Sequence, residues 1–141
     1  MNPFQSLRDY ETFIYTLPAQ FPAIQQSTLV LVQRGPRFAI LEGAVTWADG
    51  YRMTVREHLT LESGSVVIEF YGYEVWHDEI KLYWYDSQSH PIDPTLASTH
   101  PHHKHVPPDI KHNRIPAPGL SFTQPNLPFL IQEIEQAFFP S

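Results

Sequence analysis

The spacing of apolar residues predicts a helix at the start of the chain. Phe4, Leu7 and Ile14 fall on one face of a helix that runs over residues 3–16. Pro18 ends this pattern, because a proline ring blocks the interior of a helix. We therefore expect an N-terminal helix that packs its apolar face on the rest of the fold.

Residues 28–86 follow the two-residue period of β-strands. The alternation is clearest in residues 51–62, where Arg52 and Arg56 lie on the polar side. The apolar side of that strand consists of Tyr51, Met53, Val55, Leu59 and Leu61. Asp49-Gly50 is a strong hairpin signal between two such runs. The pattern predicts an antiparallel meander of four or five strands.

Residues 87–125 break the strand pattern. Nine prolines and six histidines occur between His90 and Pro128. Because proline blocks helices and central strands, we predict a long loop rich in proline and histidine. Helical spacing returns in residues 126–139, with Asn126 in the position of an N-cap, so a C-terminal amphipathic helix is expected to pack on the sheet. The apolar stripe of this helix is Leu127, Leu130, Ile131, Ile134 and Phe138.

These elements predict an α+β fold and a single domain over residues 1–141. Two domains would each be too small to bury a good core. The chain is 42% hydrophobic and only 17% charged, which excludes disorder over its whole length. It has no cysteine, so a disulfide scaffold, a cysteine zinc finger and a thiol nucleophile are excluded.

The charge of the chain limits its partners. The net charge is −6, so no general attraction to nucleic acid is expected. No apolar run reaches the roughly 18 residues of a membrane span, and the first residues lack the pattern of a secretory signal. The absence of cysteine also fits a reducing cytoplasm. Lys104, Lys111 and Arg114 lie within eleven positions of one another, which makes their segment the best candidate for binding an anion.

Five histidines accompany these cations between Thr99 and Pro116. The prolines of the segment favour extended backbone, in which side chains alternate. We therefore expect His103 and His105 to lie on one side and His102 and Lys104 on the other.

Three interpretations of the histidines are open. One imidazole could take a proton from the ribose 2′-hydroxyl of RNA while another gives a proton to the leaving oxygen, without a metal. Alternatively, His103 and His105, or His102 and His105 in a helical turn, could bind a metal ion. A carboxylate would complete that site, and the candidates are Asp86, Asp93 and Asp109. In the third interpretation the histidines are solvated, or they cap backbone groups and pack on aromatic rings.

Two weaker signals lie in the sheet. Arg52 and Arg56 share the polar strand face with His58 and would complete a basic groove if that face meets the histidine segment; an ordinary solvated face is the alternative. Aromatic residues of the last two strands could stack bases, although such residues more often form core or cross-strand pairs. They are Tyr71, Tyr73, Trp76, Tyr83, Trp84 and Tyr85.

Residues 100–106 read HPHHKHV and resemble the PHHKH signature of the TumE family, toxin components of bacterial type II toxin–antitoxin pairs. The aromatic sheet before the motif and the helix after it agree, so the resemblance extends over about residues 28–138. It implies a cytoplasmic protein that is neutralised by an antitoxin partner, typically a small helix-turn-helix DNA-binding protein. The step from toxin to ribonuclease is an analogy with other toxins.

The resulting hypothesis is a TumE-like toxin that cleaves RNA without a metal or other cofactor. His103 and His105 form the acid–base pair, and His102 is the alternate to either. The cations expected to bind substrate are Lys104, Lys111, Arg114, Arg52 and Arg56. The alternative is a non-catalytic interaction or metal-binding module, with His103, His105 and Asp109 as ligands. An exposed edge of the meander makes a homodimer plausible.

Overall fold

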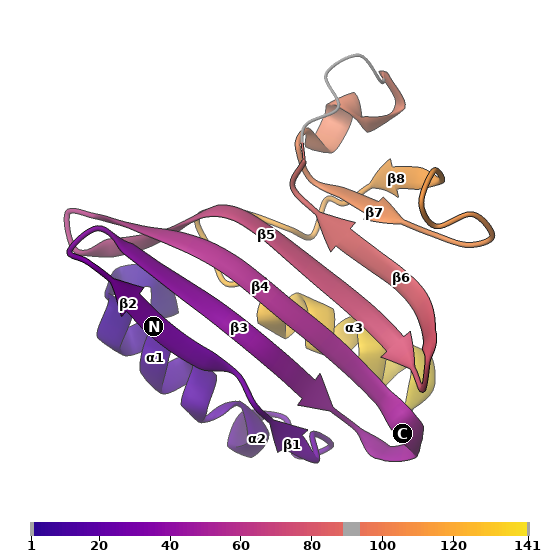
Figure 1. The fold of residues 1–141 in the computed structure, drawn as a ribbon, viewed down its shortest axis with the longest axis horizontal. Coiled ribbons are helices and arrows are strands. Elements are labelled where there is room, and N and C mark those ends of the chain that lie inside the picture. Colours follow the sequence, from indigo (N-terminus) through magenta and orange to yellow (C-terminus); the bar gives the residue numbers. More distant parts are fainter. Residues whose placement is uncertain (1, 89–93, 141) are drawn as a thin grey trace.

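A computed structural model describes residues 2–88 and 94–140, which form an antiparallel sheet with helices against one face (Figure 1). The helices are α1 (Leu7–Tyr15), α2 (Leu17–Gln20) and α3 (Leu127–Phe138), with 3-10 turns at Pro3–Gln5, Ala48–Gly50 and Pro94–Thr99. The strands are β1 (Gln26–Ser27), β2 (Val30–Arg34), β3 (Phe38–Thr46), β4 (Tyr51–Glu62), β5 (Ser65–His77), β6 (Ile80–Asp86), β7 (His103–His105) and β8 (Arg114–Pro116). Their order is β1-β3-β4-β5-β6-β7-β8, and β2 also pairs with β3.

The predicted α+β class is confirmed, and residues 28–86 contain the five strands β2–β6 of the predicted meander, but the sheet as a whole is larger than predicted. Eight strands occur in the described residues, and β7 and β8 come from the stretch predicted to be a loop. The prolines of this stretch flank β7, with Pro101 before it and Pro107 after it. Pro116 lies in β8, a strand at the edge of the sheet, where a missing N–H is tolerated.

The predicted helix over 3–16 is divided. Ser6 has extended backbone and caps α1, its hydroxyl accepting the Asp9 N–H at 3.0 Å. Tyr10 and Ile14 form the buried face of α1. Pro18 does not end the helical region, because it occupies the first turn of α2, where its lack of an N–H is tolerated.

The stripe predicted for the C-terminal helix is confirmed. Leu127, Leu130, Ile131 and Ile134 are buried against the sheet. Asn126 precedes α3, but its side chain does not cap the helix. Its amide oxygen instead accepts the Ser121 N–H at 2.8 Å, and its NH₂ group donates to the Tyr73 hydroxyl at 3.1 Å. This side chain ties the preceding loop to the sheet.

One charged residue of β4 lies on the buried face. Glu57 has no exposed surface and accepts hydrogen bonds from the hydroxyls of Tyr10 and Tyr73. Burial raises the pKa of Glu57 to about 7, although the two hydrogen bonds lower it. The alternation of β4 predicts this position as inward-facing, but not which groups bind the carboxyl.

The opposite face of the sheet carries the polar side chains of β4. Figure 1 shows α1 and α3 together behind the sheet, on the side of the core. On the other face, strand register aligns Arg56, Gly72, Asp86 and His103 across four strands. Of the helices in the described ranges, none is both long and apolar enough to cross a membrane.

Candidate active site

Strand β7 brings the histidine motif against β6. His103 pairs with Asp86 and His105 pairs with Trp84. His103 and His105 lie on the same side of the strand, as the alternation predicts, and their Nε2 atoms are 3.1 Å apart. Asp86 completes the group: its Oδ1 is 2.6 Å from Nε2 of His103, and its Oδ2 is 3.5 Å from Nε2 of His105. We call these three residues the Asp86 cluster.

Backbone carbonyls orient both rings of the Asp86 cluster. Nδ1 of His103 lies 3.1 Å from the carbonyl oxygen of Pro101, and Nδ1 of His105 lies 2.8 Å from that of Ile110. A carbonyl oxygen only accepts hydrogen bonds, so Nδ1 carries a hydrogen in each ring. The two Nε2 atoms therefore face the carboxylate. Burial alone would raise the pKa of Asp86, but hydrogen bonds from the two histidines outweigh it and hold this pKa well below its usual value.

The histidines of the Asp86 cluster are almost inaccessible. His103 is 1% exposed and His105 is 3% exposed. The ring of Trp84 stacks on His105, with 3.8 Å between the ring centroids. In this conformation neither imidazole presents a face to a large substrate.

His102 lies on the other side of β7 and is partly exposed. The Tyr71 hydroxyl is 2.6 Å from its Nδ1, and the two rings are parallel. Burial, followed by the charges of His100 and His103, lowers the pKa of His102. His100 and His102 line a hollow of about 340 Å³, together with Ser98, Thr99, Ala117, Pro118 and Leu120.

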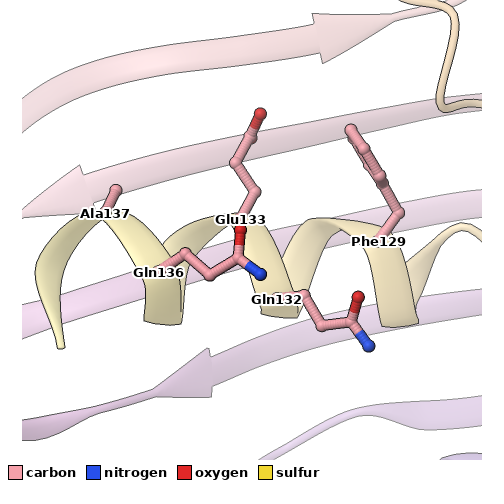
Figure 2. Close-up of a pocket in the computed structure, with 5 residues that line it drawn as sticks. All are labelled: Phe129, Gln132, Glu133, Gln136 and Ala137. Atoms are coloured by element: carbon pink, nitrogen blue, oxygen red, sulfur yellow. The ribbon is translucent and has the colours of Figure 1, made fainter. Parts of the chain in front are cut away.

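Lys104 points away from the Asp86 cluster, toward α3. Its Nζ lies 3.1 Å from Oε2 of Glu133 and 4.2 Å from the centroid of the Tyr83 ring. Figure 2 shows Glu133 beside Phe129 and Ala137 along α3, where a hollow of about 460 Å³ is found. The charge of Lys104 is therefore balanced on the helix side of the sheet.

The cations predicted to bind substrate do not gather in one place. Arg114 pairs with His105 across β7 and β8, whereas Lys111 is exposed in the connecting turn. Arg56 forms an exposed ion pair with Glu42 at 3.5 Å. Arg52 stacks on Trp76 at 4.8 Å and donates to the carbonyl of Asp78.

Arg56 nevertheless lies on the face that carries the Asp86 cluster. Gly72 lies between Arg56 and Asp86 in the sheet. Because Gly72 has no side chain, a hollow of about 310 Å³ remains there. Thr54, Val55, Arg56, Gly72, Glu74 and Trp84 line it. The polar side chains of β4 and the Asp86 cluster thus lie on the same face of the sheet, with β5 and β6 between β4 and β7. The carboxylates of Glu42, Glu74 and Asp86 lie on this face too, so it is not simply basic.

The metal-binding alternative fits Asp86, one of the three candidate carboxylates, rather than Asp109, which was predicted as the ligand with His103 and His105. Asp109 forms an exposed pair with His112 at 3.0 Å rather than joining His103 and His105. Asp86 occupies that place. Asp93, the third candidate, lies outside the described residues. His103–His105 is an extended strand, so the helical turn that would bring His102 and His105 together does not form.

Two partners of the motif could not be found from local sequence. Tyr71 contacts His102 across 31 positions, and Glu133 contacts Lys104 across 29. The available signal for Tyr71 is its place in an aromatic strand, which equally suits a core residue. Glu133 lies on a helix, and no sequence pattern around it distinguishes it from a solvent-exposed carboxylate.

The architecture and the motif define a small α+β protein in which a short strand with two histidines, β7, pairs with the aromatic strand β6. The chain belongs to the TumE toxin family, since the family model, described as Toxin TumE, matches residues 14–138. This range includes all eight strands and α3. The comparisons with curated proteins and with solved structures find no significant match. Membership in a toxin family implies an antitoxin partner.

Proposed function

We propose that this chain is a toxin that cleaves RNA by histidine acid–base chemistry, with His102 as the histidine that meets the substrate. One observation supports this choice most directly: His102 lines an open hollow with a second imidazole, His100, while Tyr71 holds its Nδ1. Among the three histidines predicted to be catalytic, His103 and His105 are buried instead.

The contact with Tyr71 suits a residue that changes its protonation state. A tyrosine hydroxyl can donate to a bare Nδ1 or accept from Nδ1–H. The pKa of Tyr71 is raised by burial and then by the charge of Asp86, so its hydroxyl stays protonated at neutral pH. The Tyr71 hydroxyl can thus hold the ring of His102 in both the neutral and the protonated state. Nε2 is the atom proposed to transfer the proton.

The proposed reaction needs no nucleophile from the protein. One imidazole removes the proton of the ribose 2′-hydroxyl, and the 2′-oxygen forms a bond to phosphorus. The bond from phosphorus to the 5′-oxygen breaks, and the second imidazole donates a proton to that oxygen. The products are a 2′,3′-cyclic phosphate and a 5′-hydroxyl. Lys111, exposed in the turn after β7, is the proposed phosphate-binding cation, because Lys104 is already paired with Glu133 and Arg114 lies opposite His105 rather than beside His102.

The experiment compares cleavage of a defined RNA with cleavage of the same sequence carrying 2′-O-methyl groups. Wild-type protein should cleave only the unmodified RNA and leave 2′,3′-cyclic phosphate ends. His102→Ala should lose about 100-fold or more in rate, the usual contribution of an acid–base residue. His112→Ala is the matched control, since His112 forms an exposed pair elsewhere in the segment. Cleavage of the methylated RNA, or equal rates for His102→Ala and wild type, would overturn the proposal.

Tyr71 is proposed as a positioning residue for His102. Tyr71→Phe removes the hydroxyl and keeps the ring that stacks on His102. Loss of one hydrogen bond of about 1.4 kcal/mol should lower kcat about tenfold with little change in KM. A purely structural role of Tyr71 would lower the amount of folded protein instead, without this split between kcat and KM.

The partner and location of the toxin follow from the same proposal. We propose that the antitoxin is a small helix-turn-helix protein and that the pair acts in the cytoplasm. A homodimer remains a prediction and is tested by the mass of the purified chain in solution. If folded wild-type protein binds its antitoxin but never cleaves RNA, the non-catalytic interaction module is the correct alternative.

A further inference from the structure

We propose that Asp86, His103 and His105 bind one divalent transition-metal ion of the zinc class, which fastens β7 to β6. This site is separate from the proposed reaction, in which His102 meets the substrate. The inference rests on how three donor atoms converge, and on the hydrogen bonds that fix their orientation.

The spacing of the donors matches a metal site. The three distances among Nε2 of His103, Nε2 of His105 and the Asp86 oxygens are 3.1, 2.6 and 3.5 Å. Ligands about 2.05 Å from a tetrahedral ion lie about 3.3 Å from one another. The distances from Nε2 of His105 to Nε2 of His103 and to Oδ2 of Asp86 are close to that value. The 2.6 Å between Nε2 of His103 and Oδ1 of Asp86 is shorter, so a bound ion would move these two side chains apart by about 0.7 Å. Three donors leave one coordination position for a water molecule or another oxygen.

The orientation of the rings is that of metal ligands. Each Nδ1–H is directed to a backbone carbonyl, the arrangement that commonly fixes a ligating histidine. In a neutral ring the lone pair is then on Nε2. If both rings are neutral, two such lone pairs and a carboxylate face one another in a site that is almost closed to solvent. Since these groups repel unless a cation lies between them, the site requires either a metal ion or a trapped proton. In the metal-free cluster, hydrogens on Nε2 are instead donated to Asp86.

The donor types select the metal. Two imidazoles and one carboxylate suit zinc, nickel or copper rather than magnesium or calcium, which prefer oxygen. No cysteine is available to compete for the ion. Because β7 is only three residues long, it has few backbone hydrogen bonds of its own to hold it. A bound ion would add a direct link from this strand to Asp86 and keep the neighbouring His102 in place.

The test uses full-length protein that has been treated with a chelator and dialysed, and then titrated with zinc by calorimetry. One equivalent should bind, and the melting temperature should rise. Asp86→Asn and His103→Ala should lose this binding, whereas Asp109→Asn, in the exposed His112 pair, should keep it. In the cobalt-substituted protein, four-coordinate absorption should appear for wild type and be absent for Asp86→Asn.

A second measurement distinguishes the site from a fold effect and from the proposed nuclease. Hydrogen exchange at the amides of β7 should slow when zinc is added to wild-type protein. His102→Ala should bind zinc as wild type does, even when it has lost RNA cleavage. Folded wild-type protein that binds no zinc would overturn the inference and leave a shared proton in the cluster. Equal zinc binding by Asp86→Asn and wild type would also overturn it.

Discussion

The buried carboxyl of Glu57 makes the stability of this protein depend on pH. Burial raises the folded-state pKa from an ordinary 4.5 to about 7. The groups that contact it, Tyr10 and Tyr73, have pKa values raised well above 10, first by their own burial and then by the charge of Glu57. They therefore stay neutral throughout the relevant range, and the titration belongs to Glu57.

The sign follows from proton binding. Between pH 4.5 and 7 the folded state keeps the proton of Glu57 while the unfolded state has lost it. Stability is therefore fully present below about pH 4.5 and falls as the pH rises toward 7. A rise of the folded-state pKa from 4.5 to about 7 corresponds to about 3 kcal/mol of unfolding free energy. Above pH 7 this contribution should no longer change.

The assay measures the free energy of unfolding by urea titration at pH 5 and pH 8, following tryptophan fluorescence. Glu57→Gln keeps the size of the side chain and, like the protonated carboxyl group, offers one acceptor oxygen and one donor, but it cannot ionise. The difference in stability between the variant and wild type should shift by about 2 to 3 kcal/mol in favour of the variant from pH 5 to pH 8. Taking this difference cancels the titration of the histidines. Parallel pH profiles, within about 1 kcal/mol of each other, would refute the reasoning.

Two further predictions concern packing. Gly43→Ala should cost about 2 to 4 kcal/mol in unfolding free energy, because φ is +143° and a Cβ would lie 2.5 Å from the backbone oxygen of Thr28. Gly72→Ala, with open space around it, should change stability by less than about 1 kcal/mol; equal losses would contradict this account. Leu130→Ala should cost about 2 to 5 kcal/mol, since Leu130 is 1% exposed in the core under α3. The substitution Gln132→Ala on the outer face of α3 is its control, and a loss as large as that of Leu130→Ala would show that burial is not the cause.

The sequence predicted much of the fold because its signals are local. Alternation defined the strands of residues 28–86, and the helical period defined α3. The prediction failed at β7 and β8, where prolines were read as breaking the sheet. Proline excludes a strand only where its missing N–H or its ring would interrupt pairing, and here the prolines flank β7 or lie at an edge.

The candidate site was predicted only in part. The alternation correctly placed His103 and His105 together, with His102 and Lys104 on the other side. It could not show that the first two are buried, or that Lys104 is paired with Glu133. Those facts depend on which strand and which helix lie opposite the motif.

By itself the sequence determined the class of the fold, the family, and the side of the strand on which each histidine lies. These properties depend on neighbouring residues and on the two-residue period of extended backbone. Only the tertiary structure decided that β7 pairs with β6 in the register that sets His103 against Asp86. A shift by one residue would turn every histidine to the opposite face. The roles proposed for these residues therefore depend on strand register, which is fixed by contacts between distant parts of the chain.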